Sequence, residues 1–189
     1  GYVGLSDRLR PDAVATVAAL HKAGIRVVML TGDNQRAAAV VAAQVGVDAY
    51  QAGVLPQNKA QAVEKYRAAG QVVGMVGDGI NDAPALAAAD VGFAIGAGAA
   101  IALDTADVVL MKSELTSVLD AISLSRATLA KIRQNLFFAF IYNILGLPLA
   151  AFGMLNPIVA GAAMAMSSVS VVSNSLLLNR WKPQSKMQR

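Results

Sequence analysis

The stretch Gly77-Asp78-Gly79-Ile80-Asn81-Asp82-Ala83-Pro84 decides the fold, because it directly follows the apolar run Gln71–Val76. Such a run is typical of a buried β-strand, and glycines after it let the backbone approach a ligand closely. Asp78 and Asp82 place two carboxylates four residues apart at the end of this strand. Oxygen ligands of this kind suit Mg²⁺, which proteins typically hold with one or two carboxylates plus a substrate phosphate.

Outward from this loop, residues 1 to about 125 alternate short apolar runs with amphipathic stretches. Strands are expected at Tyr2–Leu5, Arg26–Leu30, Gln71–Val76, Val91–Ile95 and Val108–Met111. Helices are expected at Pro11–Ala23, from Asn34 to about Val45, at Asn58–Ala69, at Ala83–Ala88 and at Leu115–Ser125. Alternating strands and helices predict an α/β domain with a Rossmann-like parallel sheet.

Two further segments of this domain are candidates for phosphate binding. Thr31-Gly32-Asp33 follows a predicted strand and opens a helix, where a hydroxyl and backbone amides can donate to phosphate oxygens. An ordinary helix cap or turn explains this tripeptide equally well. Lys59 stands near the start of another helix, either as a solvated surface lysine or as a point charge beside a phosphoryl group.

The second part of the chain predicts a membrane hairpin over residues 126–180, followed by a tail at 181–189. The runs 132–155 and 157–178 are free of charge after Arg133, and each is long enough to cross a hydrocarbon core of about 30 Å. Lys and Arg flank both outer ends, and the turn at Asn156 carries no charge. Both ends are therefore expected in the cytoplasm. A buried hairpin of a soluble protein is the alternative.

Composition narrows the classes of function. The 189 residues are 56% hydrophobic and only 15% charged, with a formal net charge of +4, whereas soluble domains usually carry about 25% charged residues. The basic residues flank apolar runs instead of forming one patch, so we expect membrane lipid and not nucleic acid as a partner. The chain has no cysteine, which excludes disulfides and Cys-based metal sites within it.

Polar side chains inside the predicted spans are costly and often functional. Tyr142 lies about 14 Å along its helix from Arg133, and Met164 and Ser168 lie about 10 and 16 Å from Pro157 on the returning helix. All three therefore fall near the middle of the membrane. The set indicates either a soft metal site or ordinary helix packing by small residues and Met.

Four motifs together resemble the phosphorylation domain of P-type ATPases, which has the haloacid dehalogenase fold. They are Asp7-Arg8-Leu9-Arg10, Met29-Leu30-Thr31-Gly32-Asp33-Asn34, Val54-Leu55-Pro56 with Lys59, and Met75-Val76 with the loop Gly77–Pro84. The resemblance implies that residues 1–125 are the C-terminal part of that domain, and it extends over essentially the whole chain.

The resemblance also implies roles for individual residues. Asp78 would bind Mg²⁺, while Asn81 and Asp82 would organise the metal and phosphate site. Lys59 would contact the phosphoryl group and Thr31 would hold it during hydrolysis. Gly32 and Asp33 would lie where nucleotide and phosphate meet, with ATP bound mainly by a domain upstream of this chain.

The membrane part resembles the last two helices of Cu(I)-exporting members. Tyr142-Asn143 and Met164-x-x-Ser167-Ser168 match their motifs, which implies that Tyr142, Asn143, Met164 and Ser168 serve the transported Cu(I). Zinc and cadmium exporters usually carry an acidic residue in these helices, and soft ligands without a carboxylate favour Cu(I) over Zn²⁺. Ag(I) shares this preference, and export of another heavy metal such as Zn or Cd stays an alternative.

Two departures from the family matter. The Asp-Lys-Thr-Gly-Thr motif, whose Asp is phosphorylated, is absent, and Gly98-Ala99-Ala100 stands where the family commonly has Gly-Thr-Asp. We therefore expect part of a longer pump, inactive alone, whose partners are its missing N-terminal part and a copper chaperone, in a bacterial inner membrane. A truncated copper-binding or regulatory protein is the second hypothesis. A soluble phosphatase with Asp7 as nucleophile is the third, although Asp7 lacks the expected Asp-x-Asp pattern.

Overall fold

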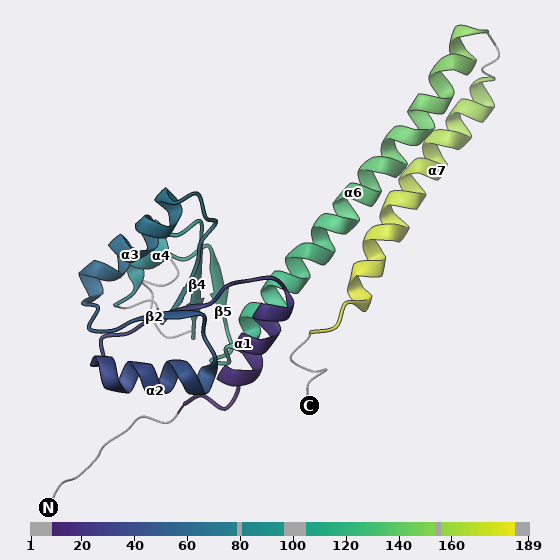
Figure 1. The fold of residues 1–189 in the computed structure, drawn as a ribbon. Coiled ribbons are helices and arrows are strands. Elements are labelled where there is room, and N and C mark those ends of the chain that lie inside the picture. The colour runs from purple at the N-terminus through teal and green to yellow at the C-terminus, as the bar shows by residue number, and fades with distance from the viewer. Residues whose placement is uncertain (1–8, 79–80, 97–104, 154–155, 184–189) are drawn as a thin grey trace, which may run out of the picture. The chain divides into compact units, whose positions relative to one another are not determined.

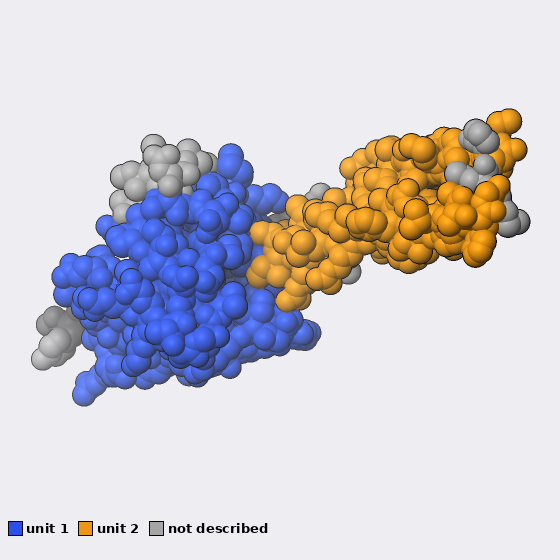
Figure 2. Space-filling model, turned by 90° about the horizontal axis from the view of Figure 1, so that it is seen from above, with its two compact units in different colours: residues 1–119 blue, residues 120–189 orange. Residues whose placement is uncertain are grey.

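The computed structural model describes residues 9–78, 81–96, 105–153 and 156–183. The chain divides into two compact units, residues 1–119 and residues 120–189 (Figure 2). The predicted strand Tyr2–Leu5, the motif start at Asp7-Arg8 and the segment Gly98–Ala100 lie outside the described residues. Whether the units are independent domains divided near residue 125 stays a prediction.

The first unit alternates helices and strands in the predicted order (Figure 1). Its elements are α1 (Ala13–Lys22), β1 (Val28–Leu30), α2 (Gln35–Val45), β2 (Ala49–Gln51), α3 (Pro56–Ala68), β3 (Gly74–Gly77), α4 (Ala83–Ala88), β4 (Val91–Ile95) and β5 (Val108–Leu110). The helix α4 and the strand β4 have the expected bounds, and β2 was not expected.

Every strand pair in the described residues is parallel, but the strands form two sheets. β1 pairs with β2, and β3, β4 and β5 form a three-stranded sheet in that order. β4 is the most buried strand, with Phe93, Ala94 and Ile95 at or below 9% exposure. Leu86 of α4 packs against Ala94, and both are almost fully buried. The core of this unit therefore lies between α4 and the central strand β4.

Local sequence explains where several elements end. The Asn34 side chain accepts a hydrogen bond from the Ala37 amide at 3.0 Å and caps α2, and Gly46 ends the same helix with φ at +78°, a conformation that glycine adopts without strain. Pro56 occupies the first turn of α3, where its missing N–H costs nothing. These residues set the lengths of the loops that carry the candidate site.

The second unit contains two long helices. α6 runs from Thr116 to Ala151 and begins in the first unit; α7 runs from Pro157 to Leu176, and a 3₁₀ turn follows at Leu177–Arg180. The predicted helix Leu115–Ser125 and the first span are thus one continuous helix, which corrects the expectation of two elements. Asn156 caps α7 by accepting a hydrogen bond from the Ile158 amide at 2.9 Å.

Both long helices are apolar and long enough to cross a membrane, judged by length and composition. Only 0% and 6% of their most apolar segments are buried within the structure, unlike the core helices of soluble proteins. Phe137 and Ile144, for example, are 61% and 62% exposed. This exposure favours the membrane hairpin over the buried hairpin of a soluble protein.

Candidate phosphate and metal sites

An ion pair forms the centre of the candidate phosphate site. Lys59, in the first turns of α3, places Nζ 2.6 Å from Oδ1 of Asp82, and the two side chains are only 17% and 12% exposed. Asp82 stands at the start of α4, and its carbonyl oxygen accepts from the amides of Ala85 and Leu86. The pair therefore joins the start of α3 to the loop after β3 and makes Lys59 more than a solvated surface lysine; its contact with a phosphoryl group stays a prediction from the family resemblance.

Gly77 is the last residue of β3 and lies against the Asp82 side chain of this pair. A Cβ atom built at Gly77 would lie 2.6 Å from Oδ2 of Asp82 and 2.7 Å from its Cβ, distances that side chains do not tolerate. Glycine is thus required here because the Asp82 side chain lies across the end of the strand. The next residue, Asp78, is exposed at the carboxyl end of β3, which is the end where parallel sheets bind ligands.

The residues of this loop fit a Mg²⁺ ion. Asp78, Asn81 and Asp82 supply carboxylate and amide oxygens within five consecutive positions, the ligand type that Mg²⁺ prefers. No group of three or more His, Cys, Asp or Glu side chains gathers among the described residues, and Mg²⁺ needs none, since it keeps water and phosphate oxygens as ligands. The exposed position of Asp78 at the carboxyl end of β3 makes it a candidate protein ligand for the ion.

The loop Thr31–Asn34 forms a separate cluster. The Thr31 hydroxyl donates to Oδ2 of Asp33 at 2.9 Å and accepts from the Asp33 amide at 3.1 Å. The amides of Gly53 and Val54 donate to the carbonyl oxygens of Asp33 and Thr31 at 2.8 and 2.9 Å. Hydrogen bonds therefore join the loops after β1 and β2 to each other. None of the hydrogen bonds described for Thr31 and Asp33 reaches Lys59 or Asp82.

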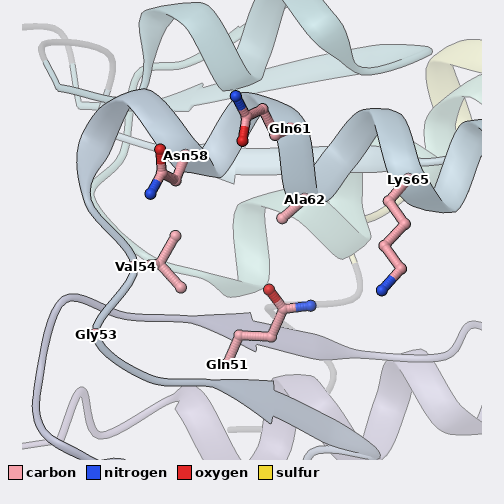
Figure 3. Close-up of a pocket in the computed structure, with 7 residues that line it drawn as sticks. All are labelled: Gln51, Gly53, Val54, Asn58, Gln61, Ala62 and Lys65. Carbon is pink, nitrogen blue, oxygen red and sulfur yellow. The ribbon is translucent and has the colours of Figure 1, made fainter.

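A polar pocket of about 320 Å³ lies between α3 and the loop after β2 (Figure 3). Gln51, Gly53 and Val54 line it from the loop side, and Asn58, Gln61, Ala62 and Lys65 line it from the helix. Figure 3 shows the Gln51 side chain pointing toward α3. Sequence reasoning missed this pocket, although Asn58, Gln61 and Lys65 recur at the spacing of one helix face.

The four predicted metal ligands lie on the hairpin, and no described hydrogen bond joins those on α6 to those on α7. Asn143 donates to the carbonyl oxygen of Ala139 at 2.8 Å, and the Ser168 hydroxyl donates to that of Met164 at 3.3 Å. Met164 is 70% exposed and Tyr142 is half-buried. All four thus lie on the two membrane-length helices, and the side chains of Asn143, Met164 and Ser168 are exposed. The predicted site role of each stays a prediction.

Comparisons with known proteins agree with this architecture. The family model of haloacid dehalogenase-like hydrolases matches residues 1–90. A probable copper-importing P-type ATPase A of Enterococcus hirae is 59% identical over 182 residues, which cover 95% of this chain and therefore both units. The chain belongs to the heavy-metal P-type ATPase family.

Other members of the P-type ATPase family match over the same extent. A probable copper-exporting P-type ATPase V of Mycobacterium tuberculosis is 52% identical over 181 residues, or 96% of the chain. The crystal structure of a zinc-transporting PIB-type ATPase in its E2.Pi state is 42% identical, with a TM-score of 0.83 over 91% of this chain and 28% of that one. The haloacid dehalogenase-like fold followed by two membrane-length helices is thereby confirmed. The chain spans about a quarter of the length of these two curated relatives.

Proposed function

We propose that this chain is part of an ATP-driven pump that exports Cu(I) or Ag(I) through an aspartyl-phosphate intermediate. It supplies the loops for Mg²⁺ and phosphate together with part of the membrane path of the metal. The observation that carries the proposal is the Lys59–Asp82 ion pair of 2.6 Å at the carboxyl end of β3, in a chain that continues into a membrane hairpin. A charged pair in this position suits the binding of a transferring phosphoryl group.

The chemistry requires a nucleophilic Asp from a segment outside this chain. Its carboxylate attacks the γ-phosphorus of ATP, ADP leaves, and water later hydrolyses the acyl phosphate to inorganic phosphate. The Lys59 ammonium stabilises negative charge on the phosphoryl oxygens, and the Thr31 hydroxyl and nearby amides donate to the same oxygens during hydrolysis. Asp78 would hold Mg²⁺, which neutralises charge on the phosphates when it is bound.

The choice of Cu(I) is supported by the donor atoms of the hairpin. Tyr142, Asn143, Met164 and Ser168 offer one thioether and several neutral oxygens, and the charge-free runs of the hairpin contain no carboxylate. Neutral and soft donors favour a soft monovalent ion over Zn²⁺. The alternative of Zn²⁺ or Cd²⁺ keeps some weight because a zinc-transporting relative has the same fold.

The direction of transport and the cellular setting belong to the proposal as well. The relatives named above include a copper importer and a copper exporter, so the direction is tested separately by metal uptake into inverted vesicles. Arg126, Lys131 and Arg133 before the hairpin, and Arg180 and Lys182 after it, support a cytoplasmic position of both its ends by the positive-inside rule, and the proposed membrane is a bacterial inner membrane. A copper chaperone is the proposed cytoplasmic donor of the ion.

The first experiment is an immunoblot of source membranes with an antibody against the C-terminal peptide 182–189. A band several times larger than the 19.5 kDa of this chain supports the pump, and ATPase activity stimulated by Cu(I) or Ag(I), compared with Zn²⁺, then identifies the metal. A band at the size of this chain contradicts the proposal. It would instead favour a truncated copper-binding or regulatory membrane protein that cannot form the phosphoenzyme.

A further inference from the structure

Four polar side chains gather between α6 and α7, about midway along α6 and near the C-terminal end of α7. Lys131 and Asn135 stand one turn apart on α6, and Asn174 and Ser175 are neighbours on α7. We call this group the polar cluster. Neither the phosphate chemistry nor the proposed metal ligands include any of its members.

The polar cluster forms one continuous chain of hydrogen bonds across the two helices. Lys131 Nζ donates to Oδ1 of Asn174, Asn174 Nδ2 donates to Oδ1 of Asn135, and Asn135 Nδ2 donates to Oγ of Ser175, each at 2.8 Å. The Ser175 hydroxyl in turn donates a hydrogen bond to the carbonyl oxygen of Val171 at 2.8 Å. Three of these four bonds cross between helices, and bonds aligned in one direction strengthen one another.

Burial shows how unusual this contact is within the hairpin. Asn174 is 9% exposed and is the only residue classed as buried among the described residues after Leu119. The one recorded hydrogen bond between the two helices nearer mid-membrane, from Ser167 to the Phe138 carbonyl oxygen, is long at 3.5 Å. Because lipid provides no hydrophobic force that draws apolar helices together, interhelical hydrogen bonds are a main source of a specific fit.

The position of the polar cluster determines which residues face each other at mid-membrane. Counting at about 1.5 Å per residue, Tyr142 lies about 10 Å beyond Asn135 along α6. On α7, Ser168 and Met164 lie about 9 and 15 Å from Asn174. Tyr142 is thus level with the space between Ser168 and Met164, and a slip of one helical turn, about 5.4 Å, would remove this match.

We propose that Asn174, with Asn135, is a positioning residue that sets the axial register of α6 against α7. This register keeps Tyr142 and Asn143 at the depth of Met164 and Ser168, and this second statement rests on the proposed metal function. Asn174 acts through the placement of other side chains and does not itself contact the ion.

Cysteine cross-linking in membranes measures the register directly, since the full chain has no cysteine of its own. The pair Phe138→Cys with Ser167→Cys reports the observed register, in which Ser167 donates to the Phe138 carbonyl oxygen. The pair Phe138→Cys with Ala163→Cys, one turn earlier on α7, reports a slip of one turn. In the unaltered cluster we expect the first pair to cross-link and the second to react poorly. Asn174→Leu removes two interhelical bonds and should reduce this preference about tenfold, at about threefold for each bond.

One control variant and one second variant of the polar cluster complete the cross-linking experiment. Asn179→Leu changes an amide of the 3₁₀ turn outside the polar cluster and should leave the preference unchanged. Asn135→Ala provides the same test if Asn174→Leu fails to insert. An unchanged cross-linking preference in both cluster variants would overturn the proposal.

The proposed effect of the helix register on metal binding is tested with Ag(I) alone, a redox-stable soft ion, on the chain in detergent micelles. Asn174→Leu should weaken Ag(I) binding, and a 138–167 cross-link in the same variant should restore it, because a covalent tether replaces the positioning but not a ligand. Unchanged binding, or no rescue, would refute the positioning role. If the unaltered chain does not bind Ag(I), the proposed metal ligands are wrong and the proposed effect on metal binding falls with them, while cross-linking still decides the register.

Discussion

At the scale of single residues, the Lys59–Asp82 ion pair is the central contact of the candidate phosphate site. Lys59→Met keeps much of the side-chain volume but leaves the Asp82 carboxylate, 12% exposed, without its counter-charge. We expect a loss of about 1–3 kcal/mol in the free energy of unfolding. Chemical denaturation of the chain in micelles measures it. Lys65→Met, an exposed lysine on the same helix, should stay within about 0.5 kcal/mol, and equal effects would contradict the assignment.

Asp90 gives a prediction about pH. Its carboxylate accepts hydrogen bonds from the Val73 amide at 2.8 Å and from Arg67 Nε at 2.9 Å. The amide first, and the guanidinium second, hold the pKa of Asp90 below its ordinary value of 3.8. A lowered pKa in the folded state stabilises the protein above the ordinary pKa, and this stabilisation is lost as the pH falls through the folded value.

Asp90→Asn should therefore be less stable than the unaltered chain at neutral pH by an amount that stays constant down to about pH 5. Below the ordinary pKa of 3.8 the difference should shrink. Denaturation of both proteins at a series of pH values measures the difference, in which the other titrating groups largely cancel. A difference that grows toward acid would show that the sign is wrong.

At the scale of elements, the packing of α4 on β4 depends on the absence of a side chain at Gly92. A Cβ at this position would lie 2.9 Å from the backbone oxygen of Leu86, and backbone cannot move aside cheaply. Gly92→Ala should cost about 1–3 kcal/mol of unfolding free energy through overpacking. Gly74→Ala, on the neighbouring strand β3, meets the Phe93 ring at 3.5 Å and the Val91 carbonyl oxygen at 3.9 Å, both ordinary contact distances, and is the control. Thermal unfolding that shifts equally in both variants would contradict this account.

Much of the first unit could be predicted because its signals are local. α4 and β4 have the expected bounds, since Asp82 and Pro84 mark the start of the helix and an apolar run ends at Gly96. β2 escaped prediction because Ala49-Tyr50-Gln51 has no strand pattern of its own, and its pairing with β1 is a tertiary contact. The division of α6 into two elements was wrong because no helix breaker separates Ser125 from Ile132.

In the candidate sites, too, local sequence signals could be predicted, whereas contacts between distant residues could not. Asp78 and Asp82 could be found from their spacing and Asn81 from the family resemblance, whereas the partnership of Lys59 with Asp82 depends on a contact across 23 positions. The polar cluster joins Lys131 to Asn174 across 43 positions. From the sequence, Asn135 and Asn174 are polar residues inside the predicted spans, but only the fold shows that they contact each other.

At the scale of the whole molecule, the continuity of α6 leads to a prediction about coupling. The helix runs from Thr116 to Ala151, with Pro148 near its end, so we expect it to transmit a change at its first turns toward the hairpin. A Gly-Pro insertion near Ser123 would break the helix. In the intact pump we expect metal-stimulated ATP hydrolysis to persist while metal transport into vesicles falls. The same insertion in the tail at residue 183 is the control, and normal coupling after the Ser123 insertion would refute the idea.

The division of the strands into a pair and a triplet also affects how the chain behaves on its own. Among the described residues, β1, β2, β3 and β5 each pair with a single strand, and the other side of an edge strand carries a row of backbone amide and carbonyl groups. Such rows are templates for pairing with any extended peptide, including another copy. In dilute solution this chain should therefore self-associate in a concentration-dependent way, and short peptides of high β-propensity that occupy the open edges should act as solubilising agents.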